Sequence, residues 1–294
     1  MRRALLIFVD GLGLGVDQEE VNPVCDDVCP VLAELIRTHG RPIDAQLGVP
    51  GLPQSATGQT SLLTGINAQA ALQCHIEGFP GSQLRAIIEA DNIFLRCREF
   101  GIPATFANAY LADDTDMVRA SRHQSVTTVA TLAAFGCVRT TRDMLAGRAV
   151  CHDLTRESLV ARGYAGPTIS LEQAAEDLCA LAAEHRFTLF EHFLTDRAGH
   201  ARSMARAREV LRRFDRFLRQ AEALCRKRGI TLVLTSDHGN IEDMSRCTHT
   251  SNAVPFVAAG PDAAVLRAAV CTIADVTPAL VRWLATEDGP SHSV

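Results

Sequence analysis

The stretch ITLVLTSDHGN, residues 230–240, joins an apolar run to an adjacent acid and imidazole. Its first half is rich in β-branched and apolar residues, which predicts a buried strand. Asp237 and His238 are neighbours and would normally point in different directions, but Gly239 permits an irregular turn that lets both face one ion. The stretch is therefore read either as a turn that closes a strand or as one side of a metal site.

Four further β-rich runs are bounded by polar or glycine-rich loops. They are ALLIFV (4–9), ATFANAY (104–110), FTLFEHFL (187–194) and VPFVAAG (254–260). Apolar residues at helical spacing occupy longer segments between and after these runs. Those segments are 29–40, 170–186, 203–229 and 275–284. Strands that alternate with helices predict an α/β fold with a mostly parallel sheet.

Polar residues of the metal-ligand type follow three of the predicted strands, and one more precedes the last strand. The set comprises Asp10, Asp196, His200, Asp237, His238 and His249. Ligand sites of open α/β sheets lie at the carboxyl ends of the strands, so these side chains are expected to meet. Each residue alone has a simpler explanation as a turn, a cap or a solvated loop. Their joint occurrence favours a site of oxygen and nitrogen ligands, which suits zinc or manganese.

The segment QSATGQTSLLTG, residues 54–65, adds a hydroxyl group to this set. Ser55 precedes Gly58 at the start of an apolar helix, where free N–H groups and the helix dipole favour an anion. A serine hydroxyl is a weak nucleophile unless a metal ion or a base activates it. The alternative explanation is a helix cap, and Thr57 is the competing hydroxyl.

The composition excludes several classes of function. The chain has 294 residues and a net charge of −5, which gives no general attraction to nucleic acid or to an anionic membrane. No apolar run reaches the ~18 residues of a membrane span, and the apolar run that ends before Asp10 is too short for a secretory signal. The ten cysteines form no CxxC pair. They are expected to be core residues in a reducing cytoplasm, the predicted location.

Together these motifs resemble the alkaline phosphatase superfamily, and most closely its metalloenzyme branch, which contains cofactor-independent phosphoglycerate mutase and phosphopentomutase. The resemblance covers roughly residues 1–70 and 185–285. It implies a first metal set and a second metal set. The first set maps to Asp10, Ser55, Asp237 and His238, and the second maps to Asp196, His200 and His249. It also implies that Ser55 is the nucleophile and that the core has three α/β/α layers.

Two departures from the family concern the substrate. The mutases have a histidine directly after the motif glycine, where this chain has Gln59. Their substrate domain is not recognisable here, and the insert is shorter than that of phosphoglycerate mutase. We therefore predict a metal-binding core over residues 1–74 and 176–294, with a small inserted cap over 75–175. A sulfatase is disfavoured because SATGQ lacks the proline and arginine of the formylglycine motif.

The predicted function is phosphoryl transfer that uses two divalent ions per chain, Mn²⁺ or Zn²⁺, about 4 Å apart, with a covalent phosphoserine at Ser55. The enzyme is expected to be a phosphatase or phosphodiesterase that acts on a small-molecule phosphate ester. Alternatives are a phosphomutase, a catalytically inactive metal-binding module and, least favoured, a metal-independent serine hydrolase. The sequence leaves the oligomeric state open. The candidates for substrate contacts in the cap are Asn108, Arg122, His123, Arg139 and Arg142.

Overall fold

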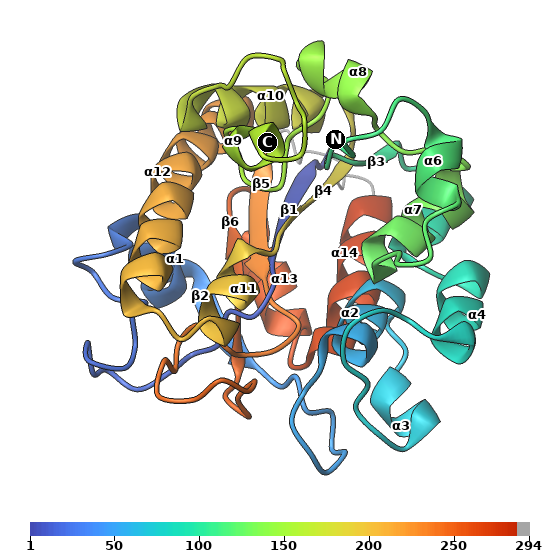
Figure 1. The fold of residues 1–294 in the computed structure, drawn as a ribbon. Coiled ribbons are helices and arrows are strands. Elements are labelled where there is room, and N and C mark those ends of the chain that lie inside the picture. Colours follow the sequence, from blue (N-terminus) through green and yellow to red (C-terminus); the bar gives the residue numbers. More distant parts are fainter. Residues whose placement is uncertain (287–294) are drawn as a thin grey trace, which may run out of the picture.

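The computed structural model describes residues 1–286, which form three layers around one six-stranded sheet (Figure 1). The strands are β1 (Ala4–Val9), β2 (Gly40–Ile43), β3 (Ala104–Phe106), β4 (Phe187–His192), β5 (Thr231–Thr235) and β6 (Val254–Ala259). Their spatial order is β2-β6-β5-β1-β4-β3. The pairs β3/β4, β4/β1 and β1/β5 are parallel, whereas β6 runs antiparallel to both β5 and β2. The predicted mostly parallel α/β sheet is confirmed.

The helices of the first half are α1 (Pro30–His39), α2 (Ser55–Thr64), α3 (Ala68–Leu72), α4 (Ser82–Ala90), α5 (Ile93–Glu99), α6 (Thr115–Arg119), α7 (Val126–Phe135) and α8 (Thr141–Leu145). Those of the second half are α9 (Glu157–Val160), α10 (Leu171–Glu184), α11 (Leu194–His200), α12 (Met204–Arg228), α13 (Ala263–Ala269), the short 3₁₀ helix η1 (Ile273–Asp275) and α14 (Val276–Ala285). None of these described helices combines the length and the apolar character needed to cross a membrane.

Alternation along the strands creates a separate apolar core on each face of the sheet. In β1, Leu5 and Ile7 enter the core formed with α1, α10 and α12, whereas Leu6 and Phe8 enter the core formed with α2, α5, α7 and α14. Side chains of successive strand residues point to opposite faces, so a strand buried on both sides is apolar throughout. Figure 1 shows α12 and α1 on one side of the sheet and α14 and α2 on the other.

Two strand predictions differ from the structure. β2 was not expected because its sequence, Gly-Arg-Pro-Ile, has neither β-branched alternation nor length; it forms because its edge pairs with β6. The predicted strand 104–110 ends at Phe106, and beyond it only single bridges occur, such as Asn108 with Val150. Beyond Phe106 the chain still follows β4, but the side chain of Asn108 takes over the hydrogen bonds with the backbone of Glu191, so the regular ladder ends.

The predicted insert, residues 75–175, has one part that packs against the sheet and another part that forms small apolar clusters. Helices α4, α5 and α7 and strand β3 pack in the core of the sheet. Most apolar residues of 107–125 and 136–165 instead form small clusters of their own, such as that of Met144, Cys151 and Leu159, whereas Ala107, Val150 and Leu154 join the core beside α10 and α12. We retain the proposal of a substrate-selecting insert for this second group.

Candidate metal centre

The residues expected to bind metal ions lie at the carboxyl ends of three adjacent parallel strands. Asp10 follows β1, Asp237 and His238 follow β5, and α11 follows β4 with Asp196 and His200 on successive turns. Because β5, β1 and β4 are neighbours in the sheet, these ends open at one edge. The remaining two residues come from outside the parallel strands: Ser55 is the first residue of helix α2, and His249 lies in the loop that leads to β6.

The first predicted set converges on the imidazole of His238. Its Nε2 atom lies 3.0 Å from the Oγ atom of Ser55 and 3.3 Å from Oδ1 of Asp10. The same atom lies 3.4 Å from Oδ2 of Asp237. Asp10, Asp237 and His238 are all buried, whereas Ser55 is half-buried and so remains accessible. All four residues predicted for this set are therefore brought together.

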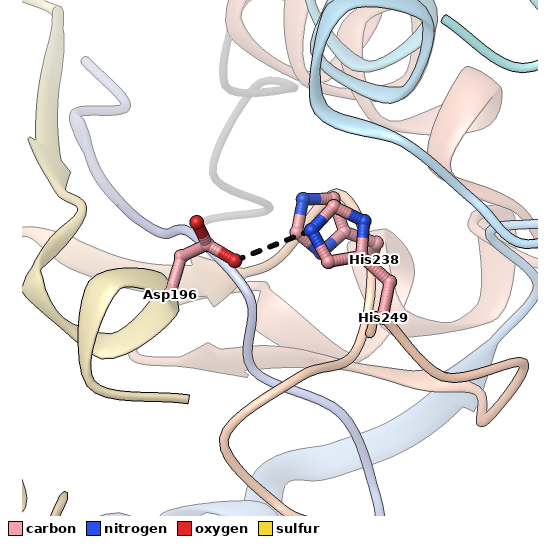
Figure 2. A group of neighbouring side chains, drawn as sticks. All are labelled: Asp196, His238 and His249. Carbon is pink, nitrogen blue, oxygen red and sulfur yellow. Dashed lines mark ion pairs between the residues drawn. The ribbon is translucent and has the colours of Figure 1, made fainter. Parts of the chain in front are cut away.

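The second predicted set meets at the carboxylate of Asp196. Its Oδ1 atom lies 3.4 Å from Nε2 of His200 and 3.5 Å from Nε2 of His249, and these two nitrogens are 3.1 Å apart. Figure 2 shows Asp196 facing the rings of His238 and His249. Those rings stack with centroids 3.7 Å apart, so His238 lies between the two sets.

The orientation of the imidazoles fits metal binding. Nδ1 of His249 lies 2.9 Å from the carbonyl oxygen of Pro53, and Nδ1 of His200 lies 3.0 Å from that of Cys247. A carbonyl oxygen only accepts, so each Nδ1 carries a hydrogen, and each Nε2 is the atom that faces the centre and can bind a metal ion when the ring is neutral. Such a hydrogen bond from the distal nitrogen is typical of histidine metal ligands.

The carboxylates provide a second test of fit. Oδ1 of Asp10 and Oδ2 of Asp237 are buried and have no hydrogen-bond partner among the described residues. A buried carboxylate oxygen without a partner is costly, and a cation that binds it removes that cost. Both atoms face His238, so the donor set present is the one that divalent ions of the zinc and manganese type prefer.

The pKa values of Asp10, Asp196 and Asp237 differ widely because these three carboxyl groups are buried close to one another. Burial, together with repulsion by Asp237 and Asp196, raises the pKa of Asp10 well above its ordinary value. Burial and the charge of Asp196 raise the pKa of Asp237 to about 7. Burial also opposes ionisation of Asp196, but hydrogen bonding to His249 and the charge of His238 outweigh it and lower that pKa to about 2. Protein groups alone thus leave two of the three acids poorly stabilised as anions.

Thr57, the competing hydroxyl, lies outside the centre. It is fully buried, and its Oγ1 atom donates to the carbonyl of Gln54 and accepts from the N–H of Ile76. The side chain of Gln59 faces inward instead, with Nε2 3.3 Å from Oδ2 of Asp10. The geometry at the start of α2 therefore supports Ser55 rather than Thr57 as the reactive group.

The five residues predicted to contact substrate are dispersed. His123 and Asn108 line a cavity, but the Asn108 amide exchanges two hydrogen bonds with the backbone of Glu191. The guanidinium of Arg139 donates to Thr105 and to the carbonyls of Phe106 and Arg148, so it joins β3 to the segment after α8. Arg122 and Arg142 are exposed on the surface and do not line this cavity.

Sequence reasoning missed two buried acids beside the centre. Glu191 accepts a hydrogen bond of 2.6 Å from Thr127, and burial raises its pKa to about 7. The sequence does contain a signal for Glu191, because it is an acid within the mostly apolar run 187–194. Glu242 is fully buried and accepts hydrogen bonds from the loops that follow β1 and β5. An acid in a loop is ordinarily solvated, so its sequence gave no signal.

Comparison with known proteins places these features in context. A family model described as the metalloenzyme superfamily matches residues 2–288. The 2,3-bisphosphoglycerate-independent phosphoglycerate mutase of Gloeothece citriformis is 29% identical over 113 residues, which are 36% of this chain and 21% of the mutase. The match thus spans about a fifth of the length of this curated relative.

Two solved structures show the same fold over nearly the whole chain. A protein from Pyrococcus horikoshii is similar with a TM-score of 0.60 and 14% identity, covering 98% of each chain. The alkaline phosphatase from the Antarctic bacterium TAB5 is similar with a TM-score of 0.51 and 13% identity, covering 97% of this chain and 99% of its own. At these identities the likeness establishes a shared architecture.

Proposed function

The chain belongs to the metalloenzyme superfamily, and from this premise we propose that it is a metal-dependent phosphoryl-transfer enzyme acting on a small phosphate ester through Ser55. One observation carries the proposal: the Ser55 hydroxyl lies 3.0 Å from Nε2 of His238, the atom that also lies 3.3 Å from Asp10 and 3.4 Å from Asp237. A hydroxyl group beside a cluster of metal-ligand side chains is the arrangement that turns serine into a nucleophile.

We propose that Asp10, Ser55, Asp237 and His238 hold one divalent ion and that Asp196, His200 and His249 hold a second, with Mn²⁺ or Zn²⁺ as the native metal. Two such ions would lower the pKa of the serine hydroxyl and neutralise charge on the phosphoryl oxygens. The mixed carboxylate and imidazole donor set supports either metal.

The residues of the chain then act in two steps. In the first step Oγ of Ser55 loses its proton and forms a bond to phosphorus as the bond to the leaving alcohol breaks, and the leaving oxygen takes up the proton that the serine has lost. In the second step water attacks the phosphoserine, which releases phosphate and restores the hydroxyl. Because Ser55 opens the ten-residue helix α2, the phosphoryl group lies at a helix N-terminus, where the dipole favours an anion.

A phosphomutase is the second candidate. The curated relatives are phosphoglycerate mutases, which supports phosphate transfer to another hydroxyl of the substrate in place of water. The absence of their histidine, where this chain has Gln59 against Asp10, supports the hydrolase. Product analysis separates the two, because hydrolysis releases free phosphate whereas transfer yields an isomerised ester.

The test begins with metal analysis of protein purified without chelators and continues with a panel of phosphate monoesters and diesters. We expect about two ions per chain and a Ser55→Ala variant that is folded but inactive. Ser82→Ala is the matched control, because Ser82 also begins a helix but is exposed and contributes no side chain to the centre. If the metal-loaded protein turns over no ester and forms no phosphoserine, the chain is an inactive metal-binding module and the proposal fails.

A further inference from the structure

A second feature of the structure is a cavity of about 520 Å³ between the sheet and the insert. Aromatic and aliphatic side chains such as Phe79, Phe106 and Phe193 form about half of its lining, and polar side chains such as Asn108, Gln124 and Ser125 form the rest. A cavity of this size accommodates a small organic molecule, since ligand pockets typically measure ~300 to 1,000 Å³. None of the seven predicted metal ligands lines it, so it is a compartment separate from the ions.

The cavity nevertheless shares its walls with the elements that carry the metal centre. Glu191 lines it, and the charge of the same carboxyl acts on Asp10. Phe193 lines it from the residue directly before α11, the helix of Asp196. A molecule whose phosphate lies at the metal centre can therefore extend past β4 into the cavity.

The opposite wall connects to the helix of the nucleophile. Phe79 belongs to the segment between α3 and α4, and Ile76 of that segment exchanges two hydrogen bonds with Thr57 of α2. Their lengths are 3.3 Å for the Thr57 N–H to the Ile76 carbonyl and 3.2 Å for the return bond to the Thr57 hydroxyl. Thr57 is two residues from Ser55, so this wall is fixed relative to the reactive hydroxyl.

The charges of the lining argue against a polyanionic occupant. Among the described residues that line the cavity, Arg162 is the one guanidinium, and it is exposed, whereas Glu191 contributes a carboxyl group at the wall nearest the metal centre. His152 is largely buried, which lowers its pKa and favours the neutral ring. A leaving group with a second phosphate would meet one exposed guanidinium, the exposed imidazole of His123 and an acid.

Flat surfaces and exposed apolar groups indicate the shape of the occupant. The rings of His152 and Phe193 stack with centroids 4.6 Å apart and an interplanar angle of 17°. At the rim, Phe79 is 53% exposed and Met117 is 55% exposed, and both line the cavity. Large apolar side chains left in water around a concave site mark a surface that contacts an apolar partner.

We propose that this cavity binds the leaving group of the phosphate ester and that the leaving group is uncharged, with a planar aromatic or comparably apolar portion. The inference rests on the proposed function, because it assigns the substrate class of the same centre. It assigns Phe79, Met117 and Phe193 to leaving-group specificity rather than to the chemical step.

The test compares two alkyl esters whose leaving alcohols have similar acidity, ethyl phosphate and 2-(2-naphthyl)ethyl phosphate. We expect the naphthyl ester to have a kcat/KM at least about 30-fold higher, because its ring is transferred from water into the cavity. Equal kcat/KM values for the two esters would overturn the inference and leave the proposed function intact.

Substitutions at the rim locate the effect without disturbing the core. Phe79→Ala, combined with Met117→Ala, should reduce the naphthyl preference, which is the ratio of the kcat/KM values for the two esters, at least about fivefold. Phe100→Ala is the matched control, because Phe100 is 58% exposed and does not line the cavity. A naphthyl preference that survives the double substitution would overturn the assignment.

A binding measurement separates failure of the inference from failure of the proposed function. Calorimetric titration with 2-(2-naphthyl)ethanol needs no turnover, and binding should weaken at least about tenfold in Ser121→Trp, which projects a ring into the cavity from its exposed side. Binding with this dependence supports the inference even if no ester is hydrolysed. No binding to the wild-type protein, or binding unaffected by Ser121→Trp, overturns it.

Discussion

Replacement of Glu242 by glutamine should loosen the metal centre although Glu242 contacts none of the seven predicted ligands. Its Oε2 atom accepts the backbone N–H of Gly13 at 2.9 Å and that of Asn240 at 2.7 Å. Its Oε1 atom accepts the hydroxyl of Thr250 and, at 3.0 Å, the amide of Asn252. These four donors come from the loops after β1, after β5 and before β6, which also carry Asp10, His238 and His249.

The expected magnitude follows from the hydrogen bonds that change. Glutamine keeps one acceptor oxygen for the two backbone N–H groups, and the hydroxyl of Thr250 can rotate to accept from the new amide. All remaining bonds lose their charge assistance, which is worth about 1 kcal/mol for each of two or three bonds. We therefore expect Glu242→Gln to lower the free energy of unfolding by about 2 to 3 kcal/mol. We also expect metal affinity to fall at least about tenfold, as for other groups that orient ligands.

The assay separates positioning from stability. Unfolding by urea in the presence of a chelator gives the free energy, and competition with a chelating dye gives the metal dissociation constant. Glu209→Gln is the matched control, because Glu209 is exposed on α12 and should change neither value. If Glu242→Gln is destabilised but binds metal as tightly as the wild type, the positioning role is refuted.

Three further predictions test the acids, the helix of the nucleophile and a structural arginine. In metal-free protein, burial raises the pKa of Glu191 to about 7 from an ordinary value of 4.5, so between these values this carboxyl keeps a proton in the folded state that it loses in the unfolded state. Burial also lowers the pKa of His238 to about 3 and that of His192 to about 4, which acts in the opposite direction, so the contribution of Glu191 is measured against Glu191→Gln. The free energy of unfolding of the wild type, relative to that of Glu191→Gln, should fall as pH rises from about 4.5 to about 7; a difference that does not change with pH in the presence of chelator would contradict this. Gly58→Ala places a Cβ atom 3.0 Å from the carbonyl oxygen of Asp237, which should displace α2 and lower kcat at least about tenfold. Gly81→Ala is the control, because its Cβ atom meets nothing within 4 Å and kcat should not change. Equal kcat values for the two variants would count against the close approach at Gly58. Arg139→Met should lower the free energy of unfolding by about 2 kcal/mol and leave KM within about twofold, and a large rise in KM would restore Arg139 as a substrate contact.

The parts of the fold that the sequence predicts are those in which one local pattern determines the outcome. The run at 4–9 is buried on both faces of the sheet and is apolar at every position, and the helix over 203–229 ends at Gly229 in the left-handed conformation. β2 lacks such a pattern because its pairing with β6 comes from outside the segment. The path of the insert is also set by distant contacts, such as the bridge between Ala109 and Arg139.

The same distinction applies to the centre. The residues proposed as metal ligands can be selected from sequence because their chemistry and their place after a strand are both visible in the chain. Substrate contacts have no such constraint, since an arginine side chain reaches in many directions. The guanidinium of Arg139 is engaged by Thr105 and two carbonyl groups, which only the folded chain brings near.

The turn in TSDHGN shows how an adjacent acid and imidazole come to serve one centre. The hydroxyl of Ser236 donates to the carbonyl of His238 at 2.9 Å and accepts the N–H of Leu12 at the same distance. The first bond closes the turn so that Asp237 and His238 face the same space, and the second fixes that turn to the loop after Asp10. A polar residue without a ligand role thus determines the geometry of three proposed ligands. Ser236→Ala should therefore weaken metal binding because the backbone of this turn shifts, although all seven proposed ligand residues are still present in the chain.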